Sequence, residues 1–226
     1  DPRRFRVIAA VTNAIKLRIG ERERDGNWRA VDDRAEMTRL GEGLEQNGFI
    51  ADAALERTVA AIADMVDEAK RRAVLATAAV GTAGLRIAAN RDRVLAVIET
   101  RTGVRIDVIS GEEEGRLAYV AATSGLGLSK GSLVAFDTGG GSTQFTFGHD
   151  SSVDERFSVD VGAVRYTERY KLDGVVSAEV MRRTMAAVAA DLSRIVGRPV
   201  PAALVARGGA VTNITAVKHG LATYDP

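Results

Sequence analysis

The residues best suited to chemistry lie in the run from Phe136 to Thr143, which reads Phe-Asp-Thr-Gly-Gly-Gly-Ser-Thr. Asp137 ends an apolar stretch, and three consecutive glycines follow it closely. Glycines let a backbone turn sharply and approach a ligand, and successive N–H groups in such a turn form a nest for phosphate oxygens. The residues expected to bind phosphate are Gly139, Gly140, Gly141, Ser142 and Thr143. Since Mg²⁺ prefers one or two carboxylates together with phosphate and water, Asp137 is the candidate metal ligand.

A flexible hairpin turn without a ligand is the competing interpretation of this run. Ordinary hairpins use two-residue turns such as Asn-Gly, and three glycines carry an entropic cost that only a ligand would offset. The pattern therefore favours a phosphate site.

A second candidate is the acidic group Glu112, Glu113 and Glu114, which follows Ser110. Ser110 with Glu113 fits a capping box, and acids in a first helical turn are favoured by the helix dipole. That interpretation accounts for Glu112 and Glu113 but hardly requires a third acid. Glu114 could instead orient or deprotonate a water molecule. The residues alone leave both interpretations of Glu114 open.

Three further features carry weaker signals. Arg86, which follows a strand and Thr82, could supply a guanidinium fork for a phosphate, or be a solvated surface residue. Gly208-Gly209 predicts a tight turn from a strand into a helix, which is a weak signal for nucleotide binding and mainly a packing feature. His149, next to Asp150, is expected to lie in an exposed loop.

The elements that must position these residues follow from apolar periodicity. Strands at 5–11, 15–19 and 28–31 open the chain as a meander. Helices are then expected at 52–72, 91–100, 110–122, 177–196 and 211–218, and strands at 74–80, 104–108, 132–137, 143–148 and 202–206. A meander followed by strand–helix alternation predicts an α/β fold. Each half begins with a strand, a polar turn and a strand, which predicts duplicated domains, 1–123 and 124–226. We expect a hinge at 122–131 and a ligand cleft between the two turns.

The amino-acid composition argues against several classes of function. The 226 residues include 31 Lys plus Arg and 30 Asp plus Glu, so a net charge of +1 gives no general attraction for nucleic acid or an anionic membrane. The absence of cysteine excludes disulfides, thiolate zinc sites and cysteine nucleophiles, and two histidines make a multi-histidine metal cage a poor hypothesis. No apolar run approaches the roughly 20 residues that span a bilayer. We therefore expect a soluble, cytoplasmic protein.

Five motifs follow one another between residues 82 and 209: Thr82-x-x-x-Arg86-x-x-x-Asn90, Ile109–Leu117, Asp137–Thr143, Val161–Arg165 with Thr167–Arg169, and Gly208-Gly209. In this combination the chain resembles the exopolyphosphatase and guanosine-pentaphosphate phosphatase family, within the superfamily of actin and the sugar kinases. The resemblance implies two actin-like (ribonuclease-H-like) domains with the active site in the cleft between them. It also implies removal of a terminal phosphate from polyphosphate or guanosine pentaphosphate, with Mg²⁺ or Mn²⁺ as cofactor. A homodimer is among the expected assemblies.

The resemblance also assigns roles to individual residues. In the family's Gly-x-Glu-Glu-Ala pattern the acid before the small residue is the base, and Glu114 occupies that position. Arg86 becomes a phosphate ligand. Thr12 and Asn13 match the end of a first phosphate-binding turn, Asp-x-Gly-Thr-Asn-Ser.

Three departures from the family pattern stand out. Gln144 replaces the usual Glu after Gly-Gly-Gly-Ser-Thr, and a neutral amide is a poorer metal ligand. The family continues for about 80 residues in helices that complete the second domain, so that domain is expected to be incomplete at its C-terminus. The first turn lacks its Asp and Gly. Either Ala9 and Val11 replace them, or an Asp-x-Gly tripeptide is missing between Val11 and Thr12; the second is favoured because Val7 to Val11 is already a complete strand.

Three hypotheses for function follow. The leading one is a phosphoanhydride hydrolase acting on polyphosphate, guanosine pentaphosphate or both. The alternative is a binding or sensor module of the same fold with weakened catalysis, which suits the altered first turn and Gln144. A small-molecule kinase or ATPase is disfavoured because the Ser-Gly-Glu-Glu-Glu pattern belongs to the phosphatase branch.

Overall fold

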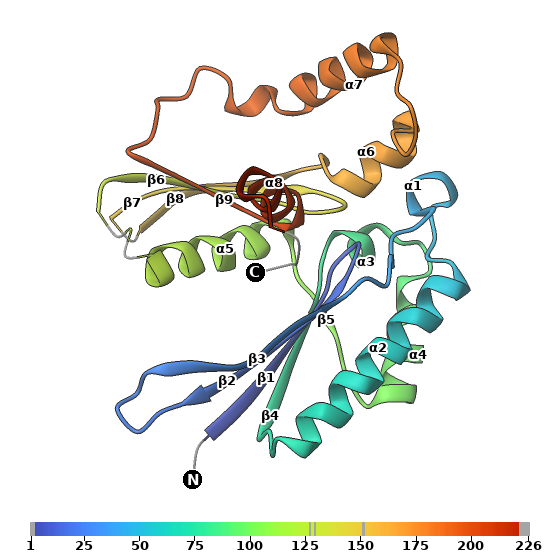
Figure 1. Cartoon of the computed structure of the whole chain (residues 1–226), viewed down its shortest axis with the longest axis vertical. Helices are drawn as coiled ribbons and strands as arrows, with labels where there is room; N and C mark the ends of the chain where they lie inside the picture. The colour runs from blue at the N-terminus through green and yellow to red at the C-terminus, as the bar shows by residue number, and fades with distance from the viewer. Residues whose placement is uncertain (1–2, 127, 129, 151, 222–226) are drawn as a thin grey trace. The chain divides into compact units, whose positions relative to one another are not determined.

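The computed structural model describes residues 3–126, 128, 130–150 and 152–221. The chain folds as two compact units, one up to Ile109 and one from Ser110 onward, and each is built on its own β-sheet (Figure 1). Helices accompany both sheets, so the α/β class predicted from the sequence is confirmed.

The first unit contains a five-stranded sheet in the order β3-β2-β1-β4-β5. Its strands are β1 (Arg3–Ala10), β2 (Ile15–Arg22), β3 (Trp28–Glu36), β4 (Ala76–Gly81) and β5 (Asp107–Val108). The first three strands form the predicted antiparallel meander, whereas β4 pairs with β1 in parallel. Ile15, Leu17 and Ile19 of β2 are fully buried while Lys16 and Arg18 are exposed, because successive side chains of a strand point to opposite faces.

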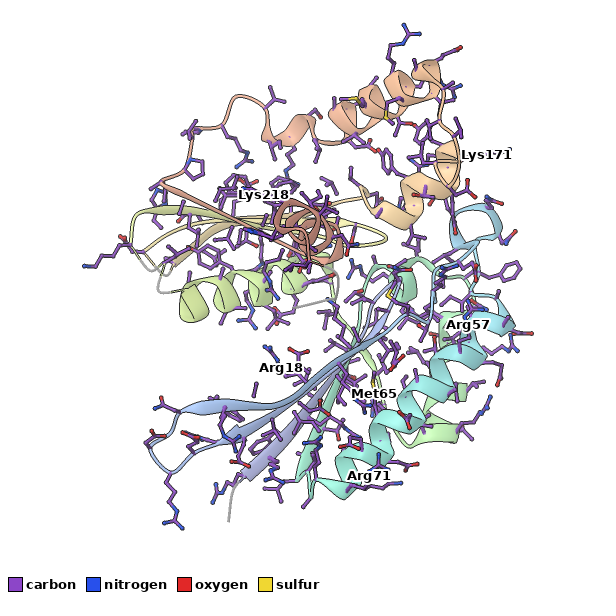
Figure 2. The ribbon with its side chains drawn as sticks, in the orientation of Figure 1. Arg18, Arg57, Met65, Arg71, Lys171 and Lys218 are labelled. Atoms are coloured by element: carbon purple, nitrogen blue, oxygen red, sulfur yellow. The ribbon has the colours of Figure 1, made fainter. Side chains whose placement is uncertain are left out.

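The helices of the first unit are α1 (Leu44–Asn47), α2 (Asp52–Arg71), α3 (Ala83–Ile87) and α4 (Arg91–Thr102). Helices α2 and α4 lie on one face of the sheet (Figure 1). Figure 2 shows Met65 between α2 and the sheet, and Arg18 on the side of the sheet away from α2. The apolar stripe predicted for α2 is buried at every position: Leu55, Val59, Ile62, Val66 and Ala69. The N-cap residue is Ala51, and Asp52 is the first residue of the helix.

The second unit repeats the arrangement of strands. Its sheet has the order β8-β7-β6-β9, with β6 (Ser132–Thr138), β7 (Thr143–His149), β8 (Ser152–Val159) and β9 (Ala203–Arg207). Again the first three strands are antiparallel neighbours, and the fourth pairs in parallel with the first. The repeated topology confirms two related α/β units.

Helices and short turns lie on both faces of the second sheet. They are α5 (Gly111–Leu126), α6 (Ala163–Tyr170), α7 (Ala178–Asp191) and α8 (Gly209–His219), with a short 3₁₀ turn at Ser193–Ile195. Tyr119 and Ala122 of α5 pack with Leu133 and Ala135 on one face. On the opposite face, Val134, Phe145 and Phe157 pack with Leu192 and Ile195. Ser177 caps α7 by accepting a hydrogen bond from the Val180 N–H, and this helix ends at Asp191 rather than at the predicted residue 196.

The boundary between the units lies before α5, not after it. The contacts of α5 are with β6, β7 and β8, so residues 110–123 belong to the second unit rather than to the predicted domain 1–123. The predicted hinge at 122–131 overlaps the end of α5 and includes residues 127 and 129, which lie outside the described residues. Among the described residues, no helix is both long and apolar enough to cross a membrane.

Candidate active site

The glycine run forms the turn between β6 and β7. Thr138 pairs with Thr143 across the two strands, and the Gly139 N–H donates a 2.9 Å hydrogen bond to the Ser142 carbonyl. Asp137 is the last residue but one of β6, so its carboxylate stands immediately before the turn. The sequence prediction of a strand, a glycine turn and a second strand is confirmed.

The first turn of α6 holds the carbonyls of this glycine turn. The backbone N–H groups of residues 163–165 donate to the carbonyls of Gly139 and Gly140 at 2.8–3.0 Å. The side-chain Nε of Arg165 donates to the Gly141 carbonyl at 2.9 Å. Three consecutive carbonyls are thus fixed from one side.

This arrangement determines where the N–H groups of the turn point. The described peptide bonds are all trans, so the N–H of each planar peptide points opposite to its carbonyl. The N–H groups of Gly140, Gly141 and Ser142 therefore project away from α6. Within the described part of the chain, no hydrogen bond uses these three donors. Neighbouring donors of this kind are what a backbone nest for a phosphate oxygen requires.

Two buried polar side chains support the turn from behind. The Thr143 hydroxyl donates to the Val161 carbonyl at 2.7 Å, and the residue is only 3% exposed. Its side chain therefore anchors the turn, and any contribution to phosphate binding would come from its backbone. Gln144 donates through Nε2 to the hydroxyls of Ser142 at 2.6 Å and Ser158 at 3.3 Å. Because Ser142 accepts from Gln144, its own O–H is left to donate to a ligand.

Asp137 lies against the beginning of α8. Strand β9 runs parallel to β6 with Asp137 opposite Arg207, so the next residue, Gly208, follows at the same edge. A Cβ added to Gly208 would lie 2.7 Å from Asp137 Oδ1 and 2.2 Å from the Thr138 carbonyl oxygen, and its φ is +99°. Gly208 is therefore more than a packing turn, because only glycine leaves room for this carboxylate.

Asp137 fits a magnesium ion that keeps most of its ligands from substrate and water. Mg²⁺ is commonly held by one or two carboxylates plus phosphate oxygens. No cluster of three His, Cys, Asp or Glu side chains suited to a metal occurs among the described residues, so a cage made of protein ligands alone is not present there. Gln144, the cross-strand partner of Asp137, adds no charge.

The acidic group lies in the first turn of α5, as predicted. The Glu113 N–H donates to the Ser110 hydroxyl at 3.1 Å, which confirms Ser110 as a cap. The Glu113 carboxylate binds Arg116 at 2.7 and 2.8 Å, and this hydrogen bonding lowers the pKa of Glu113. Glu112 is exposed and Glu114 half-buried. Glu113 therefore has a structural role, which leaves Glu114 as the candidate base.

Close packing brings the start of α5 to the same corner as Asp137. Gly115 lies so close to β7 that an added Cβ would be 2.9 Å from Thr146 Oγ1 and 3.6 Å from Gln144 Cβ. Gln144 is paired with Asp137. Glu114 therefore precedes a residue that touches the strand partner of the candidate metal ligand.

In the first unit, the turn between β1 and β2 is also tied in place through its carbonyls. The Gly41 N–H donates to the Thr12 carbonyl at 2.7 Å and the Arg39 N–H to the Asn13 carbonyl at 2.9 Å. The buried Thr12 hydroxyl accepts from the Gly84 N–H at 3.1 Å. Residues 11–14 close the hairpin and contain no acid, so this turn offers no carboxylate.

Arg86 is held beside this turn by α3. Its NH1 donates to the Ile109 carbonyl at 3.0 Å, and the residue is half-buried, so it is not a freely solvated arginine. The first unit thus brings Thr12, Asn13 and Arg86 into one region, and the second does the same for Asp137, Glu114 and the glycine turn. The predicted cleft that would join the two groups stays a prediction.

A comparison with family models identifies the family of the chain. The model of the Ppx/GppA phosphatase family matches residues 21–223 of the chain. The chain belongs to the Ppx/GppA phosphatase family. Exopolyphosphatase 2 of Mycobacterium tuberculosis is 29% identical to it over 233 residues, covering 98% of this chain and 73% of that protein. Exopolyphosphatase 1 of Mycobacterium leprae is 28% identical over 170 residues, covering 75% of this chain and 50% of that protein.

Solved structures agree with this family assignment and show the fold of the family. The PPX-GPPA enzyme of Aquifex aeolicus matches all of the chain with a TM-score of 0.81 and 27% identity, and 74% of that enzyme is covered. The recognised family and the actin-like fold class are thus confirmed. The chain spans about half the length of several curated relatives that it matches.

Two residues of the second unit were not among the predicted site residues. Arg165 binds the glycine turn through its side chain, and Gly162 lies so near the turn that an added Cβ would be 2.4 Å from the Gly140 carbonyl oxygen. Both occur in the Val161–Arg165 motif. The family resemblance rests partly on this motif, but the sequence does not indicate which part of the chain the motif contacts.

Proposed function

We propose that this Ppx/GppA phosphatase hydrolyses the terminal phosphoanhydride bond of inorganic polyphosphate. The observation that carries the proposal is the glycine turn of the second unit. Its three outward N–H groups lie at one corner with the carboxylate of Asp137 and the start of α5, which bears Glu114. Donors for phosphate oxygens, a metal ligand and a base are the parts that phosphoryl transfer needs.

Each group of residues has a separate role in the proposed reaction. The N–H groups of Gly140, Gly141 and Ser142 bind oxygens of the terminal phosphoryl group, and the Ser142 hydroxyl donates beside them. Glu114 orients a water molecule and takes its proton as the water oxygen attacks phosphorus. The bond from phosphorus to the bridging oxygen breaks in line, and the shortened chain leaves with that oxygen. Thr12, Asn13 and Arg86 of the first unit are proposed to hold the adjoining phosphates.

The proposed cofactor is Mg²⁺, or Mn²⁺ in its place, held by Asp137 together with phosphate and water. When bound, it would neutralise negative charge on the phosphate oxygens. Because Gln144 supplies no second carboxylate beside Asp137, we expect the protein without substrate to bind the ion with modest affinity.

Polyphosphate is favoured over guanosine pentaphosphate because the relatives described above carry the name exopolyphosphatase. Both compounds present the same terminal phosphoanhydride, so guanosine pentaphosphate remains part of the proposal as a second substrate. A homodimer in solution is also proposed, and light scattering on the purified chain tests it.

A binding or sensor module is the second candidate. Two observations favour it: the turn of residues 11–14 contains no acid, and Gln144 is a neutral amide at the buried position next to Asp137. Such a module would retain the nest while losing turnover.

Two measurements together separate the candidates. Phosphate release from long-chain polyphosphate is measured with Mg²⁺ and with a chelator, alongside binding of tripolyphosphate by calorimetry. Metal-dependent release supports the hydrolase, and guanosine pentaphosphate tested in parallel defines the substrate range. Binding without release supports the sensor. Neither binding nor release would refute both.

A further inference from the structure

Arg165 has an unusual environment for an arginine. Its side chain is only 10% exposed, although it carries a full charge and belongs to a short helix at the edge of the second unit. Burying a guanidinium is costly unless its donors are satisfied. The carboxylate of Asp160 lies 3.5 Å away and is 73% exposed, so this ion pair is weak. A shorter contact is the 2.9 Å hydrogen bond from Nε to the carbonyl oxygen of Gly141.

We propose that Arg165 is a positioning residue for phosphate binding, acting through the peptide between Gly141 and Ser142. This inference rests on the function proposed above. The guanidinium contacts the side of the glycine turn opposite to the N–H groups, so it binds no substrate itself. It holds the Gly141 carbonyl, and the Ser142 N–H on the same planar peptide then points the other way.

Two physical effects follow from this contact. The first is orientation, because a glycine-rich turn has more conformational freedom than any other and would otherwise sample other peptide orientations. The second is polarisation. A charged donor on a carbonyl strengthens the dipole of that peptide, which makes the Ser142 N–H a better donor to an anion. Both effects increase affinity for phosphate without a direct contact.

The hydrogen bonds made by the backbone of α6 leave one carbonyl of the glycine turn for the Arg165 side chain to hold. The carbonyls of Gly139 and Gly140 are already held by N–H groups of residues 163–165. The Gly141 carbonyl is the next in the series, and only the Arg165 side chain holds it among the hydrogen bonds described. Arg165→Met therefore removes the hydrogen bond to this peptide, whereas the hydrogen bonds to the carbonyls of Gly139 and Gly140 come from backbone N–H groups and do not need the side chain.

The test compares Arg165→Met, which removes the donors, and Arg165→Lys, which keeps the charge but lacks the planar fork, with the unchanged protein. Arg182→Met is the matched control, because Arg182 is exposed on α7 of the same unit and the change in charge is identical. Tripolyphosphate binding, KM and kcat for polyphosphate, and the melting temperature without ligand are measured for each.

We expect Arg165→Met to weaken tripolyphosphate binding and raise KM by about 10- to 100-fold, the range for losing a charge-assisted hydrogen bond. The value of kcat should change much less, Arg165→Lys should lie between, and Arg182→Met should match the unchanged protein. A purely structural arginine would instead lower the melting temperature and the fraction of active protein without altering KM.

Three results would overturn the proposal. The first is a folded Arg165→Met protein whose KM and tripolyphosphate affinity lie within twofold of Arg182→Met. The second is an equal loss in kcat with KM unchanged. The third is that neither Arg165 variant folds, since the residue would then be structural. If the unchanged protein binds tripolyphosphate but releases no phosphate, the proposed hydrolase fails, while the binding measurements still decide the role of Arg165.

Discussion

Substituting Gly208 by alanine should disable the candidate metal site while leaving the fold intact. The added Cβ would stand 2.2 Å from the Thr138 carbonyl oxygen and 2.7 Å from Asp137 Oδ1, and both distances are far below the 3.4 Å at which ordinary contact begins. The end of β6 would therefore have to move by about 1 Å. A displacement of that size at reacting groups can cost about 100-fold in rate. The left-handed φ of +99° adds roughly 1–3 kcal/mol of backbone strain for a residue with a side chain.

Gly197→Ala supplies the control for that strain. Gly197 has a φ of +77°, and nothing lies within 4 Å of the position its Cβ would take. Both variants should lose stability in thermal unfolding, but only Gly208→Ala should raise the Mg²⁺ concentration needed for half-maximal phosphate release and lower kcat/KM by about 100-fold. Equal Mg²⁺ requirements in the two variants would refute the placement of Asp137 as the metal ligand beside Gly208.

Three more predictions concern single side chains. Glu114→Gln should lower kcat by about 10²- to 10⁴-fold in a phosphate-release assay and leave tripolyphosphate binding intact. Glu113→Gln should keep most of the turnover, because the Glu113 carboxylate binds Arg116 instead. Equal losses of kcat in the two variants would mean that the base is assigned wrongly. Gln144→Glu should lower the Mg²⁺ concentration needed for activity, because it places a second carboxylate opposite that of Asp137. An unchanged or higher Mg²⁺ requirement would show that the ion does not bind beside Asp137. Burial and the hydrogen bond to Asp191 raise the pKa of Tyr166 to about 12 from 10.0, so its neutral form stabilises the fold fully below pH 10. That stabilisation should disappear as the pH rises through 12, and the difference in unfolding free energy between the unchanged protein and Tyr166→Phe should shrink over the same interval; a constant difference would contradict this.

The parts of the fold that the sequence predicted well are those fixed by local periodicity. Apolar and polar residues alternate along 15–19, which indicates a half-buried strand. Apolar residues spaced four and three positions apart from Leu55 to Ala69 indicate the buried stripe of α2. The glycine run was correctly placed between two strands because turn chemistry is also local. Nothing in these predictions required knowledge of a distant contact.

Two elements of the second unit could not be predicted in this way. In β8 only Phe157 is buried, because an edge strand has one neighbour and little core to fill, so its apolar signal is faint. Helix α6 is eight residues long, too short to be stable by itself, and its first turn is held by the carbonyls of the glycine turn. Both elements exist because of tertiary contacts.

The boundary at 123 was misplaced for a related reason. The glycine- and serine-rich run at 124–131 looks like a hinge, and the apolar stripe of α5 shows that the helix packs on a sheet without showing which one. In the structure Tyr119 and Ala122 pack on Leu133 and Ala135, so α5 belongs with the strands that follow it. A similar limit applied to the site: the residues around Glu114 left its role open, the family resemblance assigned it as the base, and no local signal pointed to Arg165.

Three helices of the second unit begin at the corner occupied by the glycine turn, which has an electrostatic consequence. Gly115 in the first turns of α5 abuts the strand partner of Asp137, α6 donates its first N–H groups to the turn, and α8 starts beside Asp137 at Gly208. Each helix N-terminus carries roughly half a positive charge, and the Arg165 guanidinium adds to them, so the corner attracts an anion such as an oligophosphate before any side chain contacts it. Attraction alone would hold the product as tightly as the substrate. In the proposed function, Asp137 and Glu114 are therefore the residues that make this corner reactive, because a carboxylate repels phosphate and is useful there only for holding a cation or directing a water molecule.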